Sequence, residues 1–370
     1  MQTESRQRPF FPYRLVMEPR LEVVPRWMPL LVSLGAIAVA LILGGIVLVL
    51  VGGNPFAAYA HIASASFGSL GVFSDTLVKA TPLILVGLAC SLAFRMKLWN
   101  IGAEGQFFLG ALGASMVVLI PILPETAPRW LTIPTMMLFG ALGGALWGFI
   151  PGYLKAKLKV NEIITTLMLN YIALSLVRFF IFGIWSEGGF EMSKVFPQTA
   201  WLPRLADYAK TVPLFRGLTT HLGLIFGLIA AAGMWYVMTR SKWGYQIRLI
   251  GDNPKAAQYA GIPIVRNTVL VMMVSGALAG LAGMSEISGV VHRLQANISP
   301  GYGFTGIIVA WLAKLNPLMV ILVSVLFGAL LLAGREIQPS GIPKLLQGII
   351  LFTLIASDVL LRYRIRIVRL

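Results

Sequence analysis

Polar side chains inside long apolar runs are the residues of this sequence that could do chemistry. An ionised group at the centre of a membrane costs roughly 3 kcal/mol or more, so polar groups in apolar segments mark a solute pathway or its gate by default. We therefore interpret six residues as candidates for a translocation pathway or gate: Asn100, Glu104, Gln106, Asn161, Asn170 and Glu286.

Several of these candidates also have a purely structural interpretation. Glu104 lies between two glycines where a helix is expected to break, so it and its neighbours can either line a cavity or cap the break. Asn161 and Glu162 fall at the expected start of a span, where capping is an equal interpretation. Glu286 falls at the outer end of its run, where exposure to water is the simpler interpretation.

The sequence carries none of the motifs that predict catalysis or a bound cofactor. It contains no G-x-x-x-x-G-K-[ST] phosphate loop, no G-x-S-x-G elbow and no H-E-x-x-H helix. The single cysteine, Cys90, lies in an apolar run, and the three histidines are far apart. We therefore expect no catalytic residues, no metal site and no cofactor, and we do not expect an enzyme.

The composition places the chain in a membrane. Of its 370 residues, 57% are hydrophobic and only 12% are charged, whereas soluble chains carry about 25% charged residues. The net charge of +16 comes from basic residues at the ends of hydrophobic runs, where the positive-inside rule places them. We expect an all-α integral membrane protein surrounded by lipid, and no binding of nucleic acid.

Ten hydrophobic runs are candidate spans, because a hydrocarbon core of about 30 Å needs about 20 helical residues. The runs are 27–51, 80–95, 105–123, 131–153, 163–184, 221–239, 267–287, 304–313, 316–334 and 343–361. The run 304–313 is too short to cross alone, so we expect a half-helix there and a total of eight to ten spans.

The basic residues also predict topology. With the N-terminus inside, most Lys and Arg residues fall in cytoplasmic segments, as the positive-inside rule requires. We expect a cytoplasmic extension at 1–26, a transmembrane domain at 27–361 and a basic cytoplasmic tail at 362–370. Both termini are then cytoplasmic, in a multi-pass membrane protein.

Two pairs of segments look like distant copies of one another. Segments 159–175 and 341–357 both enter a span through a polar, turn-prone start, and segments 98–114 and 298–313 are both punctuated by glycine. Internal repeats with interrupted helices are common in transporters. A chance match between apolar stretches is the alternative.

One polar segment, 240–266, interrupts the apolar pattern and is expected in the cytoplasm. Within it, Asn253 can cap a short helix, Pro254 suits its first position and Gly261 can end it. A short structured helix between spans indicates a contact surface for a soluble partner.

Five motifs together resemble the permease subunits of bacterial ABC importers, in the branch for simple sugars and nucleosides that is related to ribose and branched-chain amino acid permeases. The motifs are LWNIGAEGQFFLGALGA (98–114), VNEIITTLMLNYIA (160–173), IRLIGDNPKAAQYAGI (247–262), SGALAGLAG (275–283) and GYGFTGIIVAWLAKLNP (301–317). The similarity covers roughly residues 55–361, and it implies a location in the bacterial plasma (inner) membrane.

The resemblance implies partners and a coupling site. Such permeases work as a pair of identical or homologous subunits with cytoplasmic ABC ATPases, which hydrolyse ATP, and an extracytoplasmic solute-binding protein. Segment 240–266 then corresponds to the loop that couples to the ATPase, with seven matching positions: Arg248, Gly251, Asn253, Pro254, Ala256, Ala257 and Gly261.

Two other functions stay open at this point. The chain could be an ion-coupled secondary transporter that uses Glu104 or Glu286 as a proton site, or an ABC permease for branched-chain amino acids. A non-transporting interaction protein is a third class, which the ordered segment 240–266 argues against.

Overall fold

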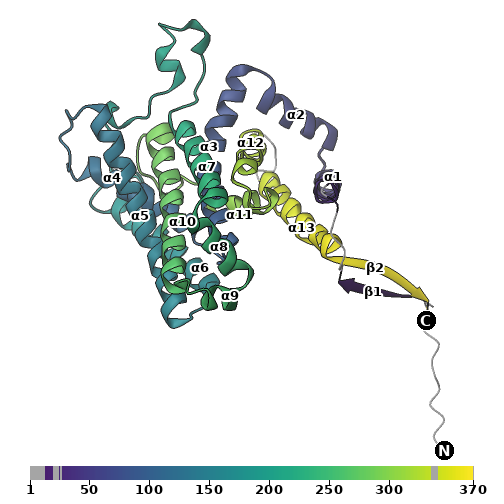
Figure 1. Cartoon of the computed structure of the whole chain (residues 1–370). Helices are drawn as coiled ribbons and strands as arrows, with labels where there is room; N and C mark the ends of the chain where they lie inside the picture. Colours follow the sequence, from purple (N-terminus) through teal and green to yellow (C-terminus); the bar gives the residue numbers. More distant parts are fainter. Residues whose placement is uncertain (1–12, 20–24, 26, 335–340, 370) are drawn as a thin grey trace, which may run out of the picture. The chain divides into compact units, whose positions relative to one another are not determined.

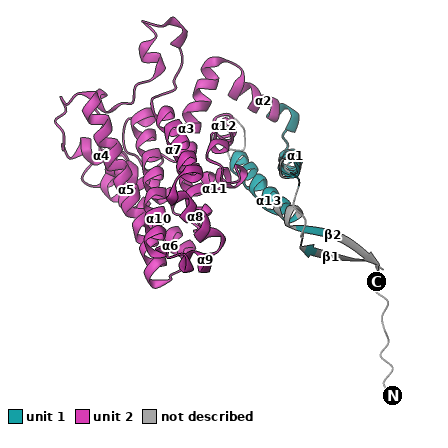
Figure 2. Cartoon of the chain, in the orientation of Figure 1, with its two compact units in different colours: residues 1–58, 338–370 teal, residues 59–337 magenta. Residues whose placement is uncertain are grey.

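The computed structural model of the protein describes residues 13–19, 25, 27–334 and 341–369 (Figure 1). In these ranges the chain is mostly helical, and its only strands form one two-stranded sheet. The chain divides into two compact units (Figure 2): unit 1 comprises residues 1–58 and 338–370, and unit 2 comprises residues 59–337.

Unit 1 joins the two ends of the chain. Helix α1 (Met28–Leu50) packs against α13 (Ile342–Arg362), and strand β1 (Tyr13–Pro19) pairs antiparallel with β2 (Tyr363–Arg369). The segment of β2 alternates basic and apolar residues from position 364 to 367, which is the period of a strand. Sequence analysis had not predicted these strands; most of the extension 1–26 lies outside the described residues.

Unit 2 is a bundle of helices. Helix α2 (Pro55–Phe67) leads into it from unit 1. The remaining α-helices of unit 2 are α3 (Leu70–Arg95), α4 (Ala103–Leu119), α5 (Arg129–Leu158), α6 (Glu162–Phe182), α7 (Gly223–Arg240), α8 (Lys242–Asp252), α9 (Pro254–Tyr259), α10 (Ile264–Glu286), α11 (Tyr302–Leu312) and α12 (Pro317–Ala333). A π-helix, Ile287–Val291, extends α10, and short 3-10 turns lie in the loop between α6 and α7.

The described helices confirm an all-α, multi-pass membrane protein. Among the described residues, six helices are long and apolar enough to cross a membrane: α1, α3, α5, α6, α7 and α10 with its π-helical extension. Four shorter apolar helices, α4, α11, α12 and most of α13, complete the set. Each of the ten predicted runs therefore corresponds to one helix, whereas α2, α8 and α9 lie outside those runs.

Helix α3 lies at the centre of unit 2. Its residues from Val78 to Phe94 are all buried, because α7, α10, α11 and α12 pack around it. A helix that is apolar on every side is stable only when neighbours cover all of its faces.

Small residues let α5 and α10 approach closely. A Cβ atom added at Gly144 would collide with the backbone of Gly276, and one added at Gly280 would collide with that of Gly140. In lipid, where no hydrophobic drive brings helices together, such close backbone contact supplies much of the packing energy.

Two helices begin inside the bundle. Helix α11 has 11 residues, about 17 Å of rise, and is too short to cross alone; this confirms the expected half-helix. It follows Gly301, whose φ of +105° favours glycine. The starts of α4 and α11 fall in the two glycine-punctuated segments.

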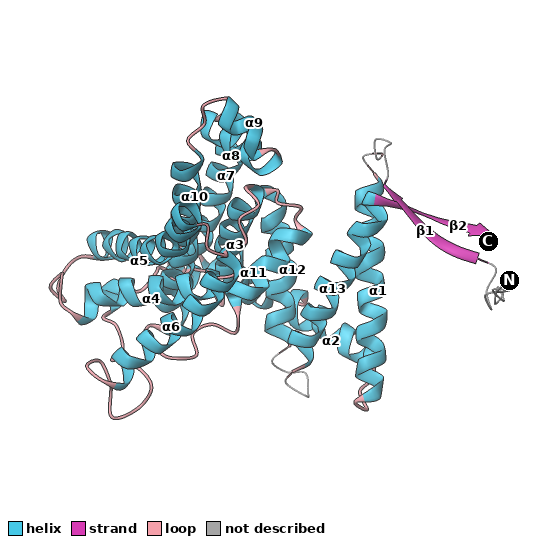
Figure 3. Ribbon diagram, turned by 90° about the horizontal axis from the view of Figure 1, so that it is seen from below, coloured by secondary structure: helices cyan, strands magenta, loops and turns pink. Residues whose placement is uncertain are grey.

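Helices α8 and α9 lie together at one end of unit 2 (Figure 3).

Candidate functional site

The first turns of α4 and α11 meet at Glu104. A carboxylate oxygen of Glu104 accepts a hydrogen bond from the backbone N–H of Gly303, at 2.5 Å. A side chain at Gly303 would collide with the backbone of Glu104. The carboxylate therefore belongs to the first turn of α4 and lies against the first turn of α11, and negative charge is favourable at both N-termini.

Asn100 and Gln106 stabilise the turn before α4 through buried hydrogen bonds. The Asn100 amide donates to the side chains of Gln106 and Ser275, at 2.8 and 2.9 Å, and Gln106 donates back to Asn100 at 3.1 Å. Ser275 donates to the carbonyl of Ala89 on α3, at 2.7 Å. This buried network ties the turn before α4 to α3 and α10.

Asn170 attaches the start of α4 to α6. Its side-chain oxygen accepts from the N–H of Gly105 at 2.8 Å, and its amide donates to the carbonyl of Ile101 at 2.9 Å. Asn161 lies at the beginning of α6, where it caps the N–H of Ile163 at 2.9 Å. A role for these residues in a pathway or gate stays a prediction, since the contacts seen are structural ones.

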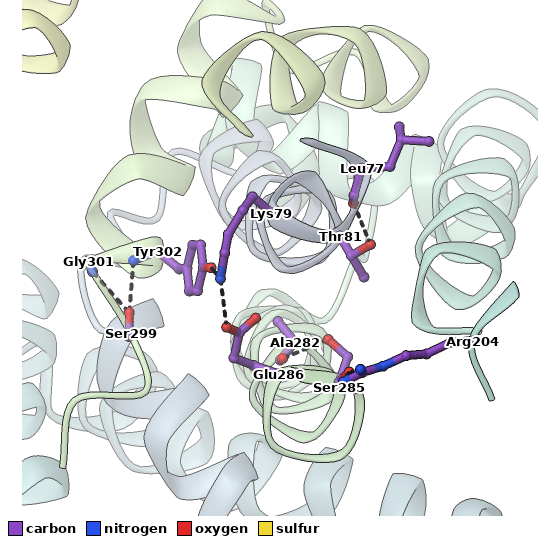
Figure 4. A network of polar contacts seen from close by, with 11 residues as sticks. Leu77, Lys79, Thr81, Arg204, Ala282, Ser285, Glu286, Ser299, Gly301 and Tyr302 are labelled. Carbon is purple, nitrogen blue, oxygen red and sulfur yellow. Dashed lines mark hydrogen bonds and ion pairs between the residues drawn. The ribbon is translucent and has the colours of Figure 1, made fainter. Parts of the chain in front are cut away.

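The expectation that Glu286 is exposed to water is wrong. Its side chain is buried, and a carboxylate oxygen lies 3.2 Å from the ammonium nitrogen of Lys79 on α3. Lys79 also donates to the hydroxyl of Tyr302, at 3.3 Å, so one cation joins α3, α10 and α11 (Figure 4). The predicted run 80–95 began after Lys79 and so left this residue out. The apolar residues on both sides of Lys79 were the signal in the sequence that it lies inside a continuous helix.

A second polar cluster holds the loop between α6 and α7 against the π-helix. The Arg204 guanidinium donates to the carbonyl of Gly289 at 2.8 Å and lies 2.7 Å from Nε2 of His292, whose ring stacks on Trp201. Burial, and next the charge of Arg204, lower the pKa of His292 to about 4 and that of His221 to about 3. Both rings are therefore neutral near pH 7.

The predicted helix in segment 240–266 is confirmed. The side chain of Asn253 caps α9 by accepting from the N–H of Ala256 at 3.1 Å, Pro254 is the first helical residue, and Gly261 follows with a φ of +70°. Helix α8, with Arg248 in its interior, precedes α9 and had not been predicted.

The seven predicted coupling residues differ in their exposure. Gly251 and Ala257 are buried within unit 2, and a side chain at Gly251 would collide with the carbonyl of Arg95 at the end of α3. Asn253, Pro254 and Gly261 are exposed, whereas Ala256 and Arg248 are half-buried.

Sequence analysis missed the most exposed aromatic side chain near this loop. Tyr259, in the last turn of α9, is 93% exposed, and Lys255 and Gln258 are exposed beside it. Tyrosine is among the residue types enriched at the energetic centres of protein–protein contacts. Its position opposite the buried Ala257 on a short helix was the only signal in the sequence.

Comparison with known proteins agrees with this architecture. Residues 72–356 match the family described as branched-chain amino acid transport system / permease component. The chain is 36% identical to a glucose ABC transporter permease of Haloferax volcanii, over 95% of this chain and 94% of the relative. It is 34% identical to a guanosine ABC transporter permease of Bacillus subtilis, over 92% and 97% of the two chains. No solved structure matches the chain.

An apolar helical bundle in which the half-helix α11 begins inside is typical of membrane transport proteins. The chain belongs to the branched-chain amino acid transport system / permease component family. It is accordingly the membrane-spanning permease component of an ABC transporter.

Proposed function

We propose that this permease imports a nucleoside or a simple sugar by alternating access, driven by ATP hydrolysis on separate cytoplasmic subunits. The cargo is inferred from relatives whose names specify glucose, guanosine and nucleosides. A second permease subunit and an extracytoplasmic solute-binding protein complete the proposed assembly. In this arrangement, both termini and the α8–α9 loop lie in the cytoplasm.

The exposed side chain of Tyr259 on the capped helix α9 is the observation that carries the coupling proposal. The inner face of the α8–α9 loop packs on the bundle through Gly251 and Ala257, and Gly251 of α8 lies against the end of α3. A force applied to α9 would therefore reach the end of α3 through α8. Tyr259, Lys255 and Gln258 form the outer face and are the residues proposed to contact the ATPase.

The ion-coupled alternative has less support. Glu104 accepts a hydrogen bond at the start of α11, and Glu286 pairs with Lys79, so both carboxylates stabilise contacts between helices. A proton site needs a carboxylate that exchanges protons with water during the cycle.

Uptake by the reconstituted complex tests the proposal. The complex in vesicles is supplied with ATP and offered nucleosides, hexoses, pentoses and branched-chain amino acids in turn. We expect ATP-dependent uptake of a nucleoside or sugar that persists when the proton gradient is dissipated. Uptake that survives ATP depletion but collapses with the gradient would support the secondary transporter, and uptake of branched-chain amino acids alone would correct the cargo.

A further inference from the structure

A basic cavity lies at the same end of unit 2 as the α8–α9 loop. Its volume is about 460 Å³, within the roughly 300–1,000 Å³ typical of ligand pockets. Four elements form it: the end of α3, the end of α7, α8, and the turn between α11 and α12.

The charge of this cavity has one sign. Arg95, Arg248 and Lys314 contribute three cations from three different elements, and no acidic residue is among the described residues that line the cavity. Thr239 and Asn316 add polar groups. Asn316 also caps the start of α12, whose N-terminal dipole adds positive potential. Converging cations from separate elements are suited to a phosphate group.

Apolar side chains lie in the cavity wall and on the helix that begins beside it. Trp235, in the last turns of α7, lines the cavity and is 40% exposed. On the adjacent helix α12, Leu318, Leu322 and Leu326 are all exposed at four-residue spacing. Pro317, the residue before Leu318, lines the cavity, and the stripe extends about 12 Å along the helix from Leu318 to Leu326.

We propose that the cavity binds the phosphate of an anionic phospholipid, with an acyl chain along the leucine stripe of α12. The three cations hold the headgroup, and Trp235 lies at the interface between headgroup and hydrocarbon, where tryptophan is enriched. Basic pockets between membrane helices are recognised sites for acidic headgroups. The apolar stripe favours a lipid over free phosphate, and the site does not depend on the identity of the cargo.

Native mass spectrometry of the full-length permease in detergent, with added phosphatidylglycerol or phosphatidylcholine, tests this site. We expect the wild-type chain to retain phosphatidylglycerol preferentially. Arg95→Gln and Lys314→Gln should each weaken that retention about fivefold, because each removes one cation from the headgroup. Lys157→Gln, which removes an exposed cation at the same end of unit 2, is the matched control and should leave retention unchanged.

Two further measurements make the result decisive. Equal thermal stability of the variants and the wild type in phosphatidylcholine shows that the variants fold. Inorganic phosphate at millimolar concentration should not displace the lipid. Retention unaffected by both substitutions, an equal loss in Lys157→Gln, or displacement by inorganic phosphate would overturn the proposal.

Discussion

The ammonium nitrogen of Lys79 lies 3.2 Å from a carboxylate oxygen of Glu286, and both side chains are buried inside the bundle. This ion pair joins the middle of α3 to the end of α10, and the Tyr302 hydroxyl extends it to α11. A charge buried without its partner is far more costly than the pair itself.

Glu286→Gln should therefore destabilise the protein strongly. Removal of one partner leaves the Lys79 charge buried and uncompensated, at a cost of about 3–5 kcal/mol. The double variant Lys79→Met with Glu286→Leu should recover much of this loss, because no buried charge remains. Thermal unfolding in detergent measures both effects.

Glu187→Gln provides the comparison for that prediction. Glu187 pairs with Arg293 at 3.9 Å, and the two side chains are 46% and 31% exposed, so the loss of this pair should cost about 1 kcal/mol or less. If Glu286→Gln were no more destabilising than Glu187→Gln, the buried pair would not have the structural importance assigned to it.

Gly303→Ala should disrupt the contact between α4 and α11. The added Cβ collides with the backbone of Glu104, and such overpacking costs about 1–3 kcal/mol. Gly233→Ala in α7, where an added Cβ would meet no described atom within 4 Å, should instead be neutral or slightly stabilising, since alanine is the better helix former. Equal melting temperatures for the two variants would contradict the close approach of α4 and α11.

Stability should fall as pH decreases from about 6.5 to 4. The folded state lowers the pKa of His292 to about 4, so in this range the unfolded chain binds a proton that the folded chain does not. The stabilisation is complete above the ordinary pKa of about 6.5 and is lost as pH falls. His292→Phe keeps an aromatic ring against Trp201 without a titrating group, so its melting temperature should depend less on pH; an unchanged slope would refute this assignment.

Structural features that depend on residues close together in the sequence could be predicted. The α9 helix was predicted because Asn253, Pro254 and Gly261 each act within a few residues of their own position. The half-helix α11 was predicted from the length of its apolar run. The strand β2 was missed, although its alternating residues were visible, because its partner β1 is distant in the sequence.

Contacts between distant segments could not be predicted. Lys79 and Glu286 are separated by 207 positions, and nothing local shows that their helices bring them together. Gly251 illustrates the same limit. Its motif indicated a contact with a partner, but glycine is needed there because any side chain would collide with the carbonyl of Arg95. A bulky substitution at Gly251 would therefore damage the permease itself and could not test coupling.

Tyr259 is the better position for testing the coupling proposal. It is 93% exposed, so Tyr259→Ala removes contact area from the outer face of α9 without disturbing the bundle. Tyr236→Ala on α7, at a residue that is 60% exposed, is the matched control. Both variants should fold as the wild type does.

The most direct measurement is the amount of ATPase subunit that co-purifies with each variant from membranes containing the whole complex. We expect Tyr259→Ala to retain about tenfold less ATPase than the wild type, because exposed aromatic anchors contribute about 1–2 kcal/mol or more to such contacts, whereas Tyr236→Ala retains a normal amount. Full retention of the ATPase by Tyr259→Ala, or an equal loss in both variants, would contradict the proposal that α9 couples this permease to its motor.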